Sequence, residues 1–456
     1  MARGKKKETL TPEERLQAAL VPESEQPYKV PGNWTWVKVG DLCTFIGGGT
    51  PDKTNPLYWN GNISWASVKD IKGSYLYSTI DKISQLGLES SSSNLCEAGD
   101  LLLVTRIEPA KTIVSKIVAA INQDLKIVKS ELSSLFLYHY FCAFQHEFEK
   151  KASGSTVKGI TLPNIQNTPF PLPPLPEQQR IVDGIESLFA KLDEAKQKAQ
   201  DALDSFETRK AAILHRAFTG ELTAQWRKEH GVGMESWENS TVGQVCHDVK
   251  VGIVIKPSQY YTDEEKGTPA FRSANVRENR IDDFDWVYLN HTGMENNSRS
   301  IVHTGDVLVV RSGNPGTACV VSEKFDGYNA IDILIAVPDH RKISSEFLCA
   351  YTNSPFGKKL IFENKRGMAL AHFNVKGYSG LPIRVPQLNE QAKIICILDD
   401  LLAKEQQAKE AAEGVLGQID LIKKAILARA FRGELGTNDP SEESAQELIK
   451  NFIFKM

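Results

Sequence analysis

The sequence predicts a mixed α/β (α+β) protein in which two globular lobes are joined by two long helices, paired as an antiparallel coiled coil. Three observations support this architecture. The motif AILHRAFTGEL at 212–222 returns near the end of the chain as AILARAFRGEL at 425–435, which indicates an internal repeat. Apolar residues precede each copy with alternating steps of three and four, as in coiled coils. Short β-rich runs such as DLLLVTRI and DVLVVRSG lie in the two remaining regions.

The two copies of the repeat match closely in the helices and poorly in the lobes. LPEQQRIV at 175–182 recurs as LNEQAKII at 388–395, at the same offset as the closing motif. The sparse anchors inside the lobes include GDLLLV at 99–104 with GDVLVV at 305–310, and Asp70-Ile71 with Asn275-Val276. A repeat kept only for stability, or as an evolutionary relic, would diverge evenly. The pattern therefore favours one scaffold that presents two different recognition surfaces.

The repeat divides the chain into seven segments. They are an N-terminal extension (1–26), a first lobe (27–170), a central helix (171–222), a linker (223–234), a second lobe (235–382), a distal helix (383–435) and a C-terminal tail (436–456).

Both helices carry the apolar spacing of a coiled-coil seam, and the polar positions between are charged. The predicted seam of the central helix is Ile181, Ile185, Leu188, Leu192, Ala195, Ala199, Ala202 and Phe206. The predicted seam of the distal helix is Ile394, Leu398, Leu401, Ala408, Ala412, Val415, Ile419, Ile422 and Ile426. Arg209 and Glu405 are the charged seam positions.

Capping residues set the predicted ends of the helices. Pro176 suits a first turn, Asn389 is a predicted N-cap, and Gly220 and Gly433 suit left-handed C-caps. Each helix of about 40 residues would be on the order of 60 Å long. The short linker at 223–234 favours antiparallel pairing, with the lobes at opposite ends and related by a pseudo-two-fold. A helix pair that only dimerises the protein is the alternative.

Composition excludes several classes of function. A formal net charge of -3 argues against a generic nucleic-acid coat, because such binding depends on many Lys and Arg. The N-terminus has no signal peptide and no apolar run is long enough for a membrane span, so we expect a cytoplasmic protein with no membrane contact. Seven scattered cysteines predict neither disulfides nor a metal site. Known catalytic motifs are missing, so we expect no catalytic residues and no enzyme activity.

Basic and amide side chains follow the strand-like anchors of both lobes, together with a Gly-rich turn at 47–51 that suits close approach to a phosphate backbone. Arg and Asn can bond two atoms of a guanine or adenine edge, whereas a single such residue is more often a solvated surface charge. The predicted DNA-binding residues are Thr50, Lys69, Lys72, Arg106, Lys111 and Lys158 in the first lobe, and Arg272, Asn275, Arg277, Arg311, Asn314, Lys365, Arg366 and His372 in the second.

These motifs resemble a known family. LPPLPEQQRIV, the heptad helix and RAFTGEL, with a second copy at the C-terminus, are similar to the specificity subunits of Type I restriction-modification systems. The resemblance covers nearly the whole chain. It implies that the two lobes are target recognition domains, each reading one half of a split site in double-stranded DNA, and that the helices measure the spacer between the halves. The second copy departs from the pattern by reading VPQLNEQ and by placing Glu405 in its seam.

The resemblance also implies partners. Two methyltransferase (M) subunits would dock on 175–222 and 388–435, and restriction/translocase (R) subunits would join them. The cofactors, S-adenosylmethionine and ATP with Mg, would bind to these partner subunits and none directly to this chain. The expected function is that of a non-catalytic specificity subunit that directs methyltransferase and endonuclease subunits to a bipartite site. The alternative is a coiled-coil scaffold with two protein-binding lobes.

Overall fold

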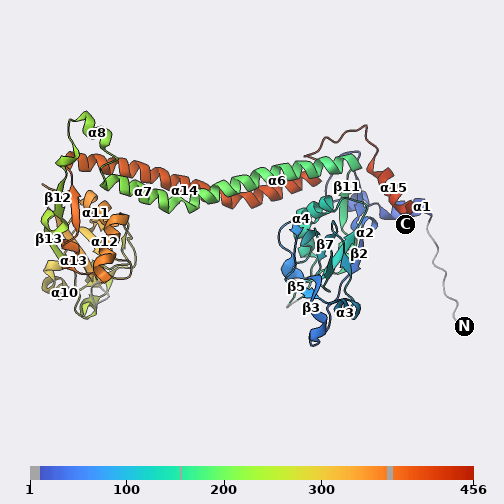
Figure 1. The fold of residues 1–456 in the computed structure, drawn as a ribbon, viewed down its shortest axis with the longest axis horizontal. Coiled ribbons are helices and arrows are strands. Elements are labelled where there is room, and N and C mark those ends of the chain that lie inside the picture. The colour runs from blue at the N-terminus through green and yellow to red at the C-terminus, as the bar shows by residue number, and fades with distance from the viewer. Residues whose placement is uncertain (1–10, 155–156, 367–372, 456) are drawn as a thin grey trace. The chain divides into compact units, whose positions relative to one another are not determined.

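The computed structural model describes residues 11–154, 157–366 and 373–455. The chain divides into two compact units, one made of Met1–Lys198 with Val415–Met456 and the other of Ala199–Gly414. Each unit therefore contains one lobe and parts of both long helices (Figure 1). No helix of the described residues has the length and apolarity needed to cross a membrane.

The lobe of the first unit is built from three small sheets (Figure 1). A five-stranded sheet has the order β2 (Thr44–Gly47), β10 (Leu125–Lys129), β7 (Leu101–Val104), β8 (Thr112–Ser115) and β4 (Tyr75–Leu76). A four-stranded sheet has the order β5 (Asp81–Ile83), β3 (Trp59–Ala66), β9 (Ala119–Ile121) and β6 (Leu95–Cys96). The third sheet is a ribbon of two strands, β1 (Thr35–Lys38) and β11 (Pro169–Leu172), and β11 leads into the central helix.

Helix α4 (Ser134–Lys150) packs against strands β7 and β8 and supplies the aromatic core of this lobe. Its apolar residues recur at helical spacing, so that Phe136, Tyr140 and Phe148 face inward and are fully buried. The Tyr140 hydroxyl donates a hydrogen bond to the carbonyl of Pro169, 2.9 Å away. Phe431, from the end of the distal helix, completes the cluster.

Both ends of the chain belong to the first unit. Helix α1 (Pro12–Ala19) begins with a capping box formed by Thr11 and Glu14, and it packs on helix α15 (Ala445–Lys455). Ala445 and Ile449 of α15 are fully buried in the same core as Phe431. The C-terminal tail thus completes the core of the first unit.

The lobe of the second unit repeats this topology. Its main sheet has the order β13 (Cys246–Val251), β22 (Ile333–Pro338), β19 (Val307–Val310) and β20 (Ala318–Val320). A second sheet has the order β14 (Tyr261–Thr262), β18 (Val287–Leu289), β15 (Thr268–Phe271) and β21 (Asn329–Ala330), with β15 parallel to β21 as β3 is to β9. The ribbon here is β12 (Glu238–Thr241) with β23 (Pro382–Val385), and a small hairpin joins β16 (Val276–Arg277) to β17 (Arg280–Ile281).

Further helices cover the second lobe and fill the linker. They are α8 (Ala224–Glu229), α9 (Val242–Val245), α10 (His291–Asn296), α11 (Ser345–Asn353), α12 (Pro355–Arg366) and α13 (Val375–Ser379). The short helix α2 (Val39–Leu42) of the first lobe occupies the place that α9 has in the second, directly after the first ribbon strand.

The distal helix is continuous, whereas the central helix is interrupted. Helix α14 runs over Leu388–Phe431, while the central segment forms α6 (Leu175–Asp204) and α7 (Phe206–Phe218) with a break at Ser205. Gly220 and Gly433 have φ values of 83° and 78°, which confirms the predicted left-handed ends. The prediction of Asn389 as an N-cap was wrong, because α14 already begins at Leu388.

Within each unit the two helices run antiparallel. In the first unit Lys423 pairs with Asp193 at 2.6 Å, and Asn438, later in the chain, bonds to Glu177, which lies earlier than Asp193. In the second unit Glu405 pairs with Arg209 at 2.8 Å, and Lys409 lies over the ring of Phe206. Residue numbers along one helix therefore rise as those along the other fall. The two predicted charged seam residues form one of these cross-helix ion pairs.

The predicted seam is correct for the central helix and partly wrong for the distal helix. The predicted positions of α6 from Ile181 to Ala202, and Phe206 at the start of α7, are buried or half-buried. On α14 the predicted seam residues that are buried or half-buried include Ile394, Leu398, Leu401, Ala412 and Ile419. The exposed ones are Ala408, Val415 and Ile422. Their places are taken by Lys409, Leu416 and Lys423, one residue further along.

Aromatic rings explain two of these three shifts, those to Lys409 and Lys423. The Lys409 ammonium lies 4.9 Å from the ring centre of Phe206, and the Lys423 ammonium lies 4.9 Å from that of Phe189. A lysine can bury its methylene stem while its charge stays over the face of a ring. A prediction that allows only apolar residues in the seam therefore places Ala408 and Ile422 there, in the positions that Lys409 and Lys423 occupy.

Candidate DNA-recognition clefts and helix junctions

The first lobe has a cleft of about 420 Å³ between the ends of its two larger sheets. The indoles of Trp59 and Trp65 form one wall and meet edge to face, with ring centres 5.2 Å apart. The full lining is Thr50, Lys53, Trp59, Trp65, Ser67, Val68, Lys69, Asp81, Ile107, Asn122, Gln123 and Asp124. Lys53 and Lys69 are exposed at its rim. Aromatic walls with lysines at the rim provide both apolar and phosphate-attracting contacts.

Asp124 organises one side of this cleft. It directly precedes β10, and its backbone carbonyl accepts the backbone N–H of Thr105, 2.8 Å away. Its carboxylate accepts hydrogen bonds from the side-chain amides of Asn122 and Gln123, each at 3.3 Å. Arg106 lies 3.3 Å from the other carboxylate oxygen, with 55% of its side chain exposed. The exposed guanidinium is therefore held in place by a largely buried acid.

The second lobe also contains an Arg–Asp pair, with its arginine one loop position earlier. Asp332 directly precedes β22, and its carboxylate lies 3.3 Å from the guanidinium of Arg311 at the end of β19. Here the burial is reversed, because the arginine side chain is 15% exposed and the aspartate 41%. The buried Nε of Arg311 has no hydrogen-bond partner among the described residues. The pair of the first lobe thus exposes its cation, whereas the pair of the second lobe exposes its carboxylate.

The loops that carry these arginines have the same backbone path in both lobes. Residues 105–111 follow β7 and residues 311–317 follow β19, and each loop contains a proline, Pro109 or Pro315. The N–H groups of Val104 and Val310 donate to Lys111 and Thr317, both at 2.8 Å. Two divergent sequences therefore build one loop shape, but the arginines occupy adjacent positions in it: Arg106 is opposite Ser312, and Arg311 is opposite Thr105.

Of the eight predicted Lys and Arg residues whose side chains the structure describes, five form ion pairs within their own lobe. The pairs are Arg106–Asp124, Lys111–Glu108, Arg272–Asp285, Arg277–Asp282 and Arg311–Asp332, at 2.6–3.3 Å. Lys69, Lys72, Lys158 and Asn314 are exposed. Thr50 is half-buried and donates its hydroxyl to Gln123 at the cleft. The cleft of the first lobe brings together only Thr50 and Lys69 of the predicted set, with Arg106 beside Asp124.

Asn275 has a structural position that does not fit the predicted base contact. It is fully buried, and its amide donates to the carbonyls of Asp282 and Phe284 while its oxygen accepts the N–H of Arg272. Asp70, its counterpart in the first lobe, holds its loop in the same way by accepting the N–H groups of Ser67 and Ile80. Both residues satisfy buried backbone donors and cannot also reach DNA in this conformation.

Three further predicted residues cannot be placed. His372 lies outside the described residues, as do the side chains of Lys365 and Arg366 at the end of α12.

The motif that opens α14 is a buried junction between the two helices of the second unit. The carboxylate of Glu390, 1% exposed, accepts hydrogen bonds from the Thr223 hydroxyl at 2.7 Å, the Arg227 guanidinium at 2.6 Å and the Trp237 indole at 3.1 Å. Thr223 and Arg227 follow the C-terminal end of the other helix, and Arg227 also donates to the carbonyl of Gly220. The start of one helix is thereby joined to the end of its neighbour.

The first unit has the equivalent junction at Glu177. This fully buried carboxylate accepts the Thr437 hydroxyl and the N–H of Asn438, which follow the end of α14, and it pairs with Arg180. A Cβ at Gly436 would lie 1.5 Å from a Glu177 oxygen, so a larger residue there would displace the carboxylate from this position. In each unit the glutamate of the PEQ/NEQ motif thus binds residues that follow the GEL motif of the neighbouring helix.

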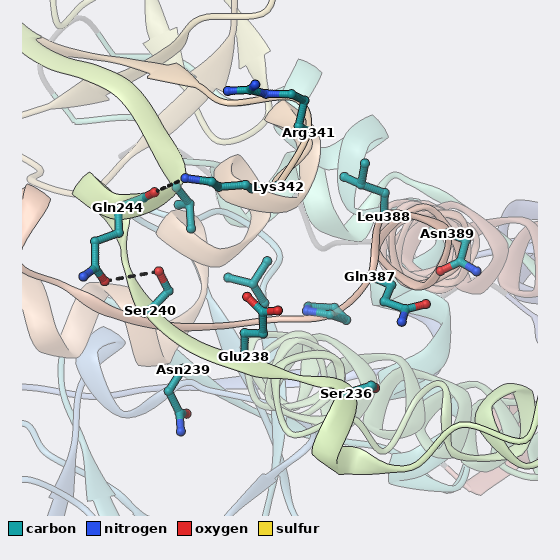
Figure 2. Close-up of a pocket in the computed structure, with 13 residues that line it drawn as sticks. Ser236, Glu238, Asn239, Ser240, Gln244, Arg341, Lys342, Gln387, Leu388 and Asn389 are labelled. Atoms are coloured by element: carbon teal, nitrogen blue, oxygen red, sulfur yellow. Dashed lines mark hydrogen bonds between the residues drawn. The ribbon is translucent and has the colours of Figure 1, made fainter.

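A wide groove borders the start of α14 in the second unit (Figure 2). It has a volume of about 850 Å³, and polar side chains line it from β12, from Gln244 of α9 and from the 341–342 turn. Figure 2 shows Gln244 between two neighbours: its side chain accepts from the Ser240 hydroxyl at 3.3 Å and its carbonyl accepts from the Lys342 ammonium at 3.0 Å. Leu388, at the edge of the groove, is 41% exposed.

A buried histidine joins α4 to α6 in the first unit. The Nε2 of His139 lies 2.9 Å from a Glu186 oxygen, while its Nδ1 has no partner among the described residues. Burial lowers the pKa of His139 from 6.5 to about 4, because the charged ring would lose its hydration. The neutral imidazole therefore donates its Nε2–H to Glu186.

This histidine predicts an acid sensitivity of the first unit. Above pH 6.5 the ring is neutral in both the folded and unfolded states, whereas between pH 6.5 and about 4 only the unfolded chain binds the proton. Stability should therefore fall with pH through this window, by about 3 kcal/mol. We expect His139→Phe to reduce that loss in thermal unfolding measured from pH 7 to 4. His146→Ala, at an exposed site, should retain the loss, and equal profiles for wild type and His139→Phe would contradict the prediction.

The described residues contain no group of three or more His, Cys, Asp or Glu side chains that could hold a metal ion.

Comparison with known proteins identifies the family. The family model described as Type I restriction modification DNA specificity domain matches residues 31–203 and again 234–413, so it covers both lobes and most of both helices. The chain belongs to this family. It is a non-catalytic specificity subunit that directs DNA recognition for a Type I restriction-modification system, and S-adenosylmethionine and ATP bind to the partner subunits of such systems.

Several known specificity subunits resemble this one. The EcoBI specificity subunit of Escherichia coli is 23% identical over 70% of this chain and 69% of its own length. The EcoKI specificity subunit of Escherichia coli (strain K12) is 24% identical, over 64% of this chain and 63% of its own. The solved HsdS subunit of Thermoanaerobacter tengcongensis has a TM-score of 0.65 at 20% identity, covering 90% of this chain and 100% of that one. At this identity the structural match establishes the fold.

Sequence reasoning about this specificity subunit missed the carboxylates. Asp124, Asp332, Glu177 and Glu390 were not selected, because only cations and amides were considered as recognition residues. A signal was available, since the matched GDLLLV and GDVLVV strands place Pro109 opposite Pro315 and so align the two loops. The Arg–Asp pairs themselves join residues that are distant in sequence, which local patterns do not reveal.

Proposed function

We propose that each lobe of this specificity subunit reads one half of a bipartite site in double-stranded DNA. The observation that carries the proposal is the pair of equivalent loops at 105–111 and 311–317, which have one backbone path and different side chains beside an Arg–Asp pair. Such a scaffold presents different hydrogen-bonding groups in equivalent positions, as is needed to read two unrelated half-sites. The paired helices then determine the length of the spacer.

We also propose that two methyltransferase subunits dock on the repeated helix motifs, and that endonuclease subunits join this complex in the cytoplasm. Leu175 and Leu388 open the two motifs and are 55% and 41% exposed despite being apolar. Apolar side chains exposed at equivalent positions are typical of a surface that binds one partner twice. The predicted seam residue Ile422, also exposed on α14, is available to the same partner.

The test is methylation mapping in cells that express the chain with its methyltransferase. We expect methylated adenines in a motif of two short halves separated by a fixed spacer. Exchange of residues 27–170 for the lobe of another family member should change one half only. A change in both halves would refute the modular assignment. If the chain were instead a scaffold with protein-binding lobes, the purified complex would show no salt-sensitive affinity for specific DNA.

A further inference from the structure

One residue of the first lobe has a strained backbone that its counterpart avoids. Ile107 has a left-handed φ of 79°, and the equivalent residue of the second lobe is Gly313, with φ 77°. Ala110 likewise has a positive φ of 65°, and the equivalent residue of the second lobe is again a glycine, Gly316, with φ 90°. A β-branched side chain is rare in this region because its Cβ crowds the backbone. The first lobe keeps the loop shape at a cost in free energy that glycine would remove.

The loop shape itself does not require isoleucine. The N–H of Ile107 donates to the carbonyl of Lys158, and the N–H of Ala110 donates to that of Val104, at 2.8 and 2.9 Å. The second lobe builds the same turn with glycine, including the bond from Gly316 to Val310 at 2.9 Å. Backbone hydrogen bonds therefore set the conformation at position 107. Any advantage of isoleucine must come from its side chain.

That side chain contributes little to the packing of the lobe. Ile107 is 56% exposed and lines the cleft that also contains Trp59, Lys69 and Asp124. Arg106, its neighbour in sequence, is 55% exposed and held by Asp124. An exposed apolar group on a strained turn, next to Arg106 and in a cleft that also contains two indole rings and two lysines, suits contact with a ligand that has both charge and apolar surface.

We propose that Ile107 is a specificity-determining residue of the first lobe and contacts the C5 methyl group of a thymine in one half-site. This inference rests on the proposed function of the lobe. Among the base edges in the major groove only thymine carries a methyl group, and apolar side chains recognise it. The cations at Arg106, Lys53 and Lys69 position the DNA through its phosphates, while Ile107 reads one base pair.

The test removes the methyl group from the DNA and the side chain from the protein. Once the motif is mapped, each thymine of the first half-site is replaced by uracil in a duplex, and binding of the complex with its methyltransferase is measured at fixed salt. For wild type we expect about fourfold weaker binding at one position, the worth of one buried methyl group. Ile107→Gly and Ile107→Asn, both compatible with the left-handed backbone, should bind thymine and uracil duplexes equally.

A matched variant separates recognition from strain. Ala110→Gly relieves the same kind of strain at a site that is 1% exposed, so it should keep the fourfold discrimination. Retained discrimination in both Ile107 variants, or wild-type binding that is indifferent to uracil at every position, would overturn the inference and leave the bipartite motif intact. Absence of any bipartite motif in the wild-type map would instead overturn the proposed function itself.

Discussion

Glu390→Ala is expected to destabilise the second unit by about 3–5 kcal/mol, because it leaves the cation of Arg227 buried without its counter-charge. The Arg227 side chain is 8% exposed, so water cannot replace the carboxylate. The indole N–H of Trp237 and the hydroxyl of Thr223 lose their acceptor as well. The thermal transition of residues 199–414 should fall by on the order of 10 °C.

Two matched variants make this prediction sharper. Glu413→Ala removes an exposed glutamate from the same helix, and we expect a change of no more than about 0.5 kcal/mol. Glu177→Ala should cost less than Glu390→Ala, about 1–3 kcal/mol, because its partner Arg180 is 35% exposed and keeps Glu442. Equal thermal shifts for Glu390→Ala and Glu413→Ala would show that the junction does not contribute to stability.

Lengthening both helices by one heptad is expected to lengthen the DNA spacer by about three base pairs while leaving both half-sites unchanged. Residues 192–198 would be duplicated in α6 and residues 408–414 in α14, so that the seam keeps its period. Seven helical residues add about 10 Å, and each base pair adds about 3.4 Å. Three base pairs also turn the duplex by roughly a third of a turn, so methylation should become weaker.

The readout for the longer helices is again the map of methylated adenines. Duplication in α14 alone is the control, because the extra heptad then has no partner in α6 and must bulge, which should weaken methylation without a defined new spacer. An unchanged spacer with full methylation in the doubly lengthened protein would refute the measuring role of the helices. Altered half-sites would refute the separation of reading from measuring.

The junctions also change the interpretation of the repeat. The matched helix motifs suggested a surface that binds one partner twice, and exposed Leu175 and Leu388 agree with that proposal. The buried residues of the same motifs, Glu177 and Glu390, have another role. Each hydrogen-bonds the start of one helix to residues that follow the end of its neighbour. Closely matched sequence therefore reflects an internal constraint as well as a partner surface.

The sequence alone determined the features that follow from local periodicity and from self-similarity. These are the two lobes, the two long helices, their left-handed ends at Gly220 and Gly433, and the family. Each is encoded in residues close together in the chain or in identity between the copies. A helix needs only its own apolar period and caps, and a repeat is visible without knowledge of contacts.

Only the tertiary structure decided which side chains serve recognition and which hold the fold. Asn275 had the right chemistry for a base contact, yet its side-chain amide is already hydrogen-bonded to carbonyls of its own loop. Lys409 and Lys423 entered the seam because rings on the facing helix accept their charge. Ile107 stands out only through its backbone angle and the glycine opposite it. Burial, strain and ion pairing depend on residues far apart in sequence, so they exist only once the chain has folded.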